Sequence, residues 1–204
     1  AERMIDATAP DESYKTLLEC GYAPLERCTL ENVEHALSQA RRELYREVSV
    51  LAPDKRIVEL FQIKYDYHNA KLVLKSKRTG EDVSRLAMDC GRFDAQKVLR
   101  GETSAVSAAM SRAMAQAESE AGHSGDVRMA ELLLDRACYE EMSALANETG
   151  SAFLKDYVAL QIDAVNLRTL VRAQRMGCED DVFAAAMLPG GHIPAGQFKG
   201  TRGD

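Results

Sequence analysis

Apolar residues recur every three to four positions along most of this chain. The clearest run passes from Leu30 through Val33, Leu37, Ala40 and Leu44. That spacing places the apolar side chains on one face of an α-helix. No segment alternates apolar and polar residues in the way that a half-buried strand would. The pattern therefore predicts an all-α protein.

Proline and glycine fall between the periodic segments, where they interrupt helices. Pro53 and Asp126 suit helix starts, whereas Gly80 and Gly177 suit helix ends. A break is expected at 122–125, which contains two glycines. The predicted helices are 11–19, 29–51, 55–78, 103–121, 126–146, 151–175 and 180–187, with a further short helix closing 87–99.

Part of the sequence occurs twice. A shift of 97 residues aligns 65–82 with 162–179. The matched positions are Asp66 with Asp163, Asn69 with Asn166, Arg78 with Arg175, and Gly80 with Gly177. A second match, at a shift of 100 residues, places Gly91, Phe93, Ala95 and Val98 on Gly191, Ile193, Ala195 and Phe198. A helix, a glycine stop and a glycine-containing loop recur in the same order, which favours a duplicated unit.

The repeated Asp and Asn lie on an apolar helix face. At 100° per residue, Asp66 and Asn69 fall among aliphatic side chains, and Asp163 and Asn166 do the same. A buried polar group without a partner costs about 1–3 kcal/mol, so each must form hydrogen bonds, most simply with a helix end or a loop amide. We therefore interpret all four as a structural clasp. A catalytic carboxylate is the alternative, although no second acid, base or nucleophile recurs with it.

Basic residues follow the same two helices on another face. They are Lys71, Lys75 and Arg78 in the first copy and Arg168, Arg172 and Arg175 in the second. Both sets follow the spacing i, i+4, i+7, so each forms one stripe along its helix. A solvated helix face explains such a stripe, and cations near a helix C-terminus are favoured electrostatically. The other interpretation is a docking surface for an acidic partner.

Composition and charge argue against several classes of function. A net charge of −6 argues against a general nucleic-acid binder. The five cysteines are scattered without a C-x-x-C pair, and the four histidines are as dispersed, so neither a metal site nor a cofactor site is predicted. No apolar run reaches the length of a membrane span, and the first residues do not resemble a signal peptide. These features suggest a cytoplasmic protein with reduced thiols.

Several segments together resemble a known family. They are ERMIDATAPDESYKTLLECGY (2–22), IKYDYHNAKLVLKSKRTG (63–80), FLKDYVALQIDAVNLRTLVRAQRMG (153–177) and MLPGGHIP (187–194). They look like the C subunit of V-type and archaeal-type ATP synthases, whose counterpart in the eukaryotic vacuolar ATPase is the d subunit, the AC39 family. The shared signature is a D-x-x-N-x-[KR] motif, which appears twice here in register with its flanking loops.

The resemblance implies a funnel-shaped subunit of three similar helical units around a pseudo-threefold axis. On that basis 1–100 is the first unit, and 101–204 is the second with the start of a third, so the chain is expected to be incomplete. Such a subunit is a non-catalytic socket between the central stalk and the membrane rotor ring, on the cytoplasmic side. It transmits torque for proton or sodium transport. A helical scaffold or signalling adaptor of another system is the alternative, as is a helical enzyme that uses Asp66 or Asp163 as an acid or base.

Overall fold

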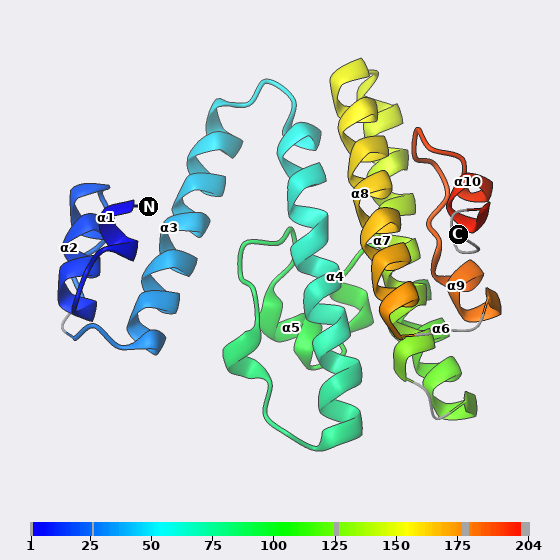
Figure 1. The fold of residues 1–204 in the computed structure, drawn as a ribbon, viewed down its shortest axis with the longest axis horizontal. Coiled ribbons are helices and arrows are strands. Elements are labelled where there is room, and N and C mark those ends of the chain that lie inside the picture. Colours follow the sequence, from blue (N-terminus) through cyan, green and yellow to red (C-terminus); the bar gives the residue numbers. More distant parts are fainter. Residues whose placement is uncertain (1, 26, 125–126, 177–179, 201–204) are drawn as a thin grey trace. The chain divides into compact units, whose positions relative to one another are not determined.

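The computed structural model describes residues 2–25, 27–124, 127–176 and 180–200. Every regular element in these ranges is a helix (Figure 1), which confirms the all-α prediction. The α-helices are α1 (Glu2–Ile5), α2 (Pro10–Glu19), α3 (Leu30–Leu51), α4 (Lys55–Thr79), α5 (Ala95–Leu99), α6 (Ala108–Ser124), α7 (Val127–Thr149), α8 (Ala152–Met176), α9 (Asp180–Ala186) and α10 (Ala195–Gly200). Two 3-10 turns, η1 (Ser84–Leu86) and η2 (Thr103–Ala105), lie between them.

The chain divides into two compact parts at the start of α4. We call Ala1–Pro53 the N-terminal part and Asp54–Asp204 the main part. The repeat units expected from the sequence, 1–100 and 101–204, meet at a different boundary. They are defined by sequence similarity and not by compactness, and they stay a prediction.

The N-terminal part contains α1, α2 and α3. An ion pair joins α1 to the end of α2, with Nη1 of Arg3 2.6 Å from Oε2 of Glu19. Thr29 caps α3, because its hydroxyl oxygen accepts a hydrogen bond of 3.2 Å from the amide of Asn32. Along α3, only Ala36 is buried.

The core of the main part lies among its four long helices. Fully buried side chains come from α4 (Leu60 and Ile63), α6 (Met110), α7 (Leu134) and α8 (Ile162). Because the apolar stripes of these helices face one another, burial in this one core holds them together.

Helices α4 and α7 lie antiparallel along their whole length. At one end, Nη1 of Arg56 donates a hydrogen bond of 3.1 Å to the carbonyl oxygen of Glu148. At the other, Nζ of Lys75 is 3.5 Å from Oε1 of Glu131. Figure 1 shows α4, α7 and α8 as the long neighbouring helices of this part.

The helix boundaries agree with the sequence at most ends. Gly80 ends α4 in the left-handed conformation, with φ of 69°, as expected for a helix C-terminus. The ends of α6 differ from the expectation: the helix starts at Ala108 rather than Thr103, after the 3-10 turn η2, and it continues past Gly122 to end at Ser124, inside the expected break at 122–125. A single glycine costs a helix only about 1 kcal/mol, which the alanine-rich preceding turns offset. The predicted start at Asp126 and end at Gly177 lie outside the described residues.

Helices α9 and α10 pack against the second half of α8. They form a small separate core, made of Leu170, Ala173, Phe183, Met187 and Phe198. Within the described ranges, no helix is both long and apolar enough to cross a membrane.

Candidate functional site: two helix–loop clasps

The Asp66 side chain is fully buried and joins α4 to the loop before α5. Its Oδ1 accepts hydrogen bonds from the backbone amides of Arg92, at 2.9 Å, and Phe93, at 3.3 Å. Its Oδ2 accepts a third bond of 2.6 Å from Nε of Arg92. The carboxylate is 0% exposed, so these bonds replace the water that it lost on burial.

Asn69, one helical turn further along α4, holds the same loop through Met88. Its Nδ2 donates to the carbonyl oxygen of Met88 at 2.7 Å, and the amide of Met88 donates to Oδ1 of Asn69 at 2.9 Å. Asn69 is also 0% exposed. We call the pair Asp66 and Asn69 with the loop 88–93 the first clasp.

The second clasp repeats this arrangement on α8. Asn166 donates from Nδ2 to the carbonyl oxygen of Leu188 and accepts from the Leu188 amide, both at 2.9 Å. Asp163 accepts from the amides of His192, at 3.0 Å, and Ile193, at 3.1 Å. Each loop partner is 100 residues after its counterpart in the first clasp. Both Asp–Asn pairs therefore bind the loop that precedes a short helix further along the chain, α5 in the first clasp and α10 in the second.

A glycine in each loop leaves room for the carboxylate. A methyl group at Gly91 would lie 2.2 Å from Oδ1 of Asp66. The same addition at Gly191 would lie 2.0 Å from Oδ1 of Asp163. These distances are far below van der Waals contact, so each loop approaches its helix closely only because residues 91 and 191 lack a side chain. This requirement explains why the two glycines recur in the sequence.

The first clasp carries an ionic network with no counterpart among the described residues of the second. Arg92 bonds to Asp66 and, through Nη1 at 2.9 Å, to Oε1 of Glu141 on α7. Tyr67 donates its hydroxyl to Oε2 of the same glutamate at 2.8 Å. At the matching position of the second clasp, the side chain of His192 is exposed. Arg92, Glu141 and Tyr67 were not predicted from the sequence, because none of them recurs in the second copy.

Burial dominates the electrostatics of this network. It raises the pKa of the Asp66 carboxyl, and the Arg92 guanidinium acts against that rise. Burial also opposes the charge on Arg92, but the bonds to Asp66 and Glu141 outweigh it and raise the pKa of the guanidinium. Burial, together with the nearby charge of Glu141, raises the pKa of Tyr67. The cation is thus held in place by two acids, although its Nη2 finds no partner among the described residues.

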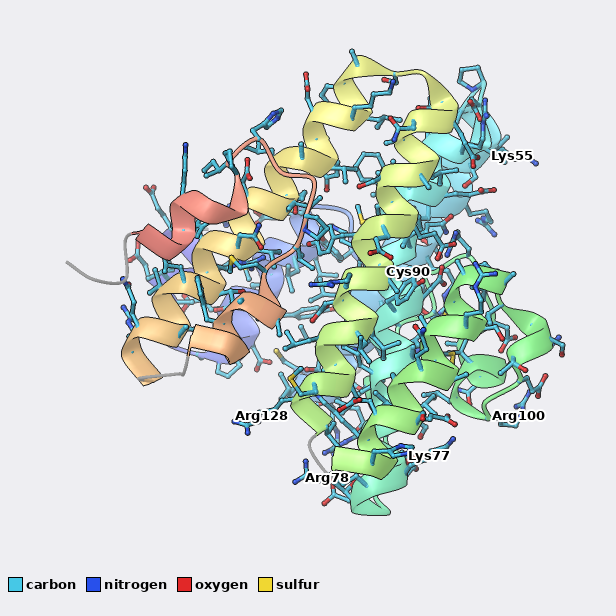
Figure 2. The ribbon with its side chains drawn as sticks, turned by 90° about the vertical axis from the view of Figure 1, so that its right-hand side faces the viewer. Lys55, Lys77, Arg78, Cys90, Arg100 and Arg128 are labelled. Carbon is cyan, nitrogen blue, oxygen red and sulfur yellow. The ribbon has the colours of Figure 1, made fainter. Side chains whose placement is uncertain are left out.

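Two of the three residues of the first basic stripe form ion pairs with acids of this same chain. Lys71 forms an ion pair with Asp135 on α7, and Lys75 forms another with Glu131. Lys77, next to Arg78 at the end of α4 that lies opposite Lys55 (Figure 2), pairs with Glu118 of α6. An external acidic partner would find fewer unpaired cations on this stripe, because Asp135 and Glu131 of α7 already pair with Lys71 and Lys75.

The second basic stripe differs from the first. Arg168, Arg172 and Arg175 are exposed on α8. Within the described ranges, none of them forms an ion pair, and the only hydrogen bond found for the three joins Nε of Arg168 to the carbonyl oxygen of Ala164 at 3.3 Å. Together with Leu167 and Val171, they line a shallow depression of about 510 Å³.

The clasp carboxylates are arranged for holding a loop. Asp66 and Asp163 are buried, and all four of their oxygens accept hydrogen bonds from the loops. A general acid or base needs a path to a substrate proton, which this burial does not leave open. Within the described ranges, no group of three His, Cys, Asp or Glu side chains is placed to hold a metal ion. The geometry therefore favours the structural interpretation of the four clasp residues.

Comparison with known proteins agrees with the family resemblance. The family model described as ATP synthase (C/AC39) subunit matches residues 1–200. The C subunit of the V-type ATP synthase of Thermus thermophilus is 27% identical over 178 residues, which cover 80% of this chain and 53% of that protein. The C subunit of the V-type sodium ATPase of Enterococcus hirae is 23% identical over 198 residues, which cover 95% of this chain and 60% of that protein. The chain thus spans less than two thirds of the length of these relatives.

Proposed function

We infer the function of this chain from its family, because the chain belongs to the ATP synthase (C/AC39) subunit family. We propose that it is a non-catalytic adaptor of a V-type rotary ATPase. In this role it forms part of a socket that joins the central stalk to the membrane rotor ring and transmits torque between them. The observation that carries the proposal is the family match over residues 1–200.

The identities of the two relatives support a place in such a complex. Both are C subunits, one of a V-type ATP synthase and one of a V-type sodium ATPase. We propose by extension that this chain works on the cytoplasmic side of the membrane, next to the ring. Either protons or sodium ions could be the transported ion, because an adaptor of this kind takes no part in binding the ion.

The two clasps suit the mechanical role of an adaptor. A part that transmits torque must resist bending and local opening. Helices α4 and α8 are 25 residues long each, and each is tied through buried polar side chains to a loop further along the chain. Opening a clasp breaks several hydrogen bonds, each with a net worth of about 0.5–1.5 kcal/mol, so the loops resist displacement under load. We propose that three such units surround a pseudo-threefold axis in the whole socket.

Co-purification tests this proposal. The full chain carries an affinity tag and is expressed in cells of its own organism, whose membranes are then dissolved in a mild detergent. We expect the proteolipid ring and the central-stalk subunits to be recovered with the tag and identified by mass spectrometry. The same tag on an unrelated helical protein is the control. Recovery of the chain without either partner would overturn the proposal, and recovery with another assembly would favour the scaffold alternative.

A second measurement tests the non-catalytic role. The purified chain is incubated with Mg-ATP, and phosphate release is followed over hours. We expect no release above the rate in buffer. Turnover that persists through purification and disappears in Asp163→Asn with the fold intact would instead establish an enzyme.

A further inference from the structure

The two clasps hold their loops through the same Asp and Asn contacts, but the first clasp has an additional tie. Nε2 of Gln62, one helical turn before the clasp aspartate, donates hydrogen bonds to the carbonyl oxygens of Cys90, at 3.1 Å, and Gly91, at 3.2 Å. At the shift of 97 residues, the corresponding position of α8 is Ala159, whose methyl group forms no hydrogen bond. The loop of the second clasp therefore lacks one of the ties that hold the first.

The short helices that follow the two clasps lie in different cores. Val98 of α5 is fully buried in the main core. Its counterpart at the shift of 100 residues, Phe198 of α10, lies in the small core beside the second half of α8. Figure 1 shows α9 and α10 next to α8, on the side away from α4. We call residues 180–200, which comprise α9, the second clasp loop and α10, the strap.

A side chain of α7 ties the strap from the other side. Nη2 of Arg136 donates hydrogen bonds to the carbonyl oxygens of Ala185, at 3.3 Å, and Met187, at 3.2 Å. The last carbonyls of a helix have no partner within it, so Arg136 caps the end of α9. The arginine is half-buried, and water competes for its bonds. Arg136 thus joins the strap to α7 by a contact that is open to exchange with solvent.

We propose that the strap opens and closes as one unit while the main core stays folded, and that Arg136 is the latch that holds it closed. Opening breaks the bonds of the second clasp and of Arg136, withdraws Leu188, and uncovers Leu170 and Ala173 of α8. Segments held by few buried contacts are the ones that open locally in folded proteins. The first clasp is built into the main core, so it opens only when the helices α4, α6, α7 and α8 come apart.

This inference goes beyond the proposed function and does not depend on it. It concerns the motion of this chain by itself. The strap would be the first element of the main part to yield, and the long helices would keep their packing while it does. The second clasp is then a releasable joint, whereas the first is a permanent one.

Hydrogen exchange of the intact 204-residue chain tests the opening. The reporters are the backbone amides that bond to the clasp side chains, namely Leu188, His192 and Ile193 in the strap and Met88, Arg92 and Phe93 in the first clasp. The two sets correspond position by position, so they are matched. Exchange at single amides is followed by nuclear magnetic resonance and corrected for the rate of an unprotected amide. We expect the three strap amides to share one protection factor, lower than that of the first-clasp amides by about a hundredfold or more.

Two variants separate local opening from unfolding of the whole chain. Arg136→Met keeps an unbranched side chain but cannot donate hydrogen bonds, so strap protection should fall about five- to thirtyfold. Ile63→Val removes one buried methyl group from the main core, which is intact whether the strap is open or closed. That variant should lower the protection of the first-clasp amides about two- to tenfold and leave the strap amides unchanged. Arg112→Met, at an exposed position of α6, is the matched control and should change neither set.

A cysteine beneath the strap gives an independent measurement. Ala173→Cys places a thiol on α8 at a position that is 5% exposed while the strap is closed. The rate of its reaction with iodoacetamide is measured by peptide mass spectrometry, relative to the rate in urea, and compared with that of the buried Cys138 in the main core. We expect the new thiol to react in the folded chain well before Cys138. Adding Arg136→Met should accelerate it by the same factor as it accelerates strap exchange.

Several outcomes would overturn the inference. Equal protection of the two sets of amides, or widely different protection within the strap, would show that the strap does not open as a unit. If Ile63→Val lowers both sets alike, the strap opens only with the whole chain. If Arg136→Met leaves strap protection unchanged, Arg136 is not the latch, and a thiol at residue 173 as unreactive as Cys138 would show that α8 stays covered. None of these measurements needs a rotor subunit, so their failure is distinguishable from failure of co-purification.

Discussion

Gly191 lies so close to Asp163 that a methyl group on residue 191 would be 2.0 Å from Oδ1 of the carboxylate. The same relationship holds between Gly91 and Asp66, at 2.2 Å. In both places the buried acid accepts hydrogen bonds from the amides of the two residues that follow the glycine. The hydrogen bonds depend on the close approach, because the loop must contact the helix before its amides can reach the carboxylate.

Gly191→Ala should therefore destabilise the chain by forcing the loop away from α8. The expected loss in free energy of unfolding is about 1–3 kcal/mol, the usual cost of overfilling a packed site. Urea denaturation followed by circular dichroism measures it. Gly122→Ala is the matched control, because Gly122 lies in α6 with open space around it. That change should raise stability by up to about 1 kcal/mol through helix propensity. Equal effects at the two positions would contradict the close approach.

Asn166→Ala should cost more than any exposed asparagine change. The substitution leaves the amide and the carbonyl of Leu188 without partners, and Asn166 is fully buried. At about 1–3 kcal/mol for each of the two unmade bonds, we expect a loss of roughly 2–6 kcal/mol in thermal or urea unfolding. Asn147→Ala, at an exposed position in the last turn of α7, should change stability by less than about 0.5 kcal/mol. A small effect at Asn166 would show that water or a shifted loop replaces its bonds.

Arg92→Ala and His192→Ala should differ strongly although the two positions correspond. Alanine keeps both backbone amides, so each carboxylate retains its bonds to them. Only Arg92→Ala removes a side chain that pairs with Asp66 and Glu141. Losing one partner of a buried ion pair costs about 3–5 kcal/mol, whereas the exposed His192 side chain should matter by less than about 0.5 kcal/mol. Urea unfolding of both variants beside the wild-type chain measures the difference.

Glu141→Gln in the Arg92→Ala background provides an internal check on that comparison. It removes one of the two negative charges left behind, so part of the lost stability should return. If the double variant is no more stable than Arg92→Ala, the network does not hold the cation electrostatically.

The cysteines should react in an order set by burial. Cys20 is exposed, whereas Cys138 is buried and its pKa is raised to about 12, mainly by that burial. Because the thiolate is the reactive form and each pKa unit is a factor of ten, Cys138 should hold roughly a thousandfold less thiolate than an ordinary thiol at pH 8. Iodoacetamide labelling read by peptide mass spectrometry should modify Cys20 first and Cys138 only after unfolding in urea. Rapid labelling of Cys138 in the folded chain would show that α7 opens locally. Cys178 lies outside the described residues.

Much of the clasp was readable from the sequence because it obeys helical periodicity. Asp66 and Asn69 are one turn apart on an apolar face, and the second copy repeats them, so burial and a need for partners followed directly. The second match, at a shift of 100 residues, also pointed to the loops, since Gly91 and Gly191 are the positions that must lack a side chain. Local helical spacing and the duplication were therefore enough to predict these clasp residues.

The ionic network could not be found in that way. Arg92, Glu141 and Tyr67 are separated by 25 to 74 positions and come together only through the packing of α4 against α7. No period connects them, and the second copy has His192 in place of the arginine. Gly122 shows a different limit, because its low helix propensity was outweighed by the alanine-rich turns before it.

The contact between α4 and α7 joins two unlike surfaces, a basic apolar face and an acidic apolar face. A contact of that kind is directional, because one helix supplies the basic face and the other supplies the acidic face. Repetition of such a contact gives a closed ring when the successive rotations add up to a full turn, and an open filament when they do not. For three units the rotation per step is about 120°. One crossing of two helices would then decide how many units complete the assembly.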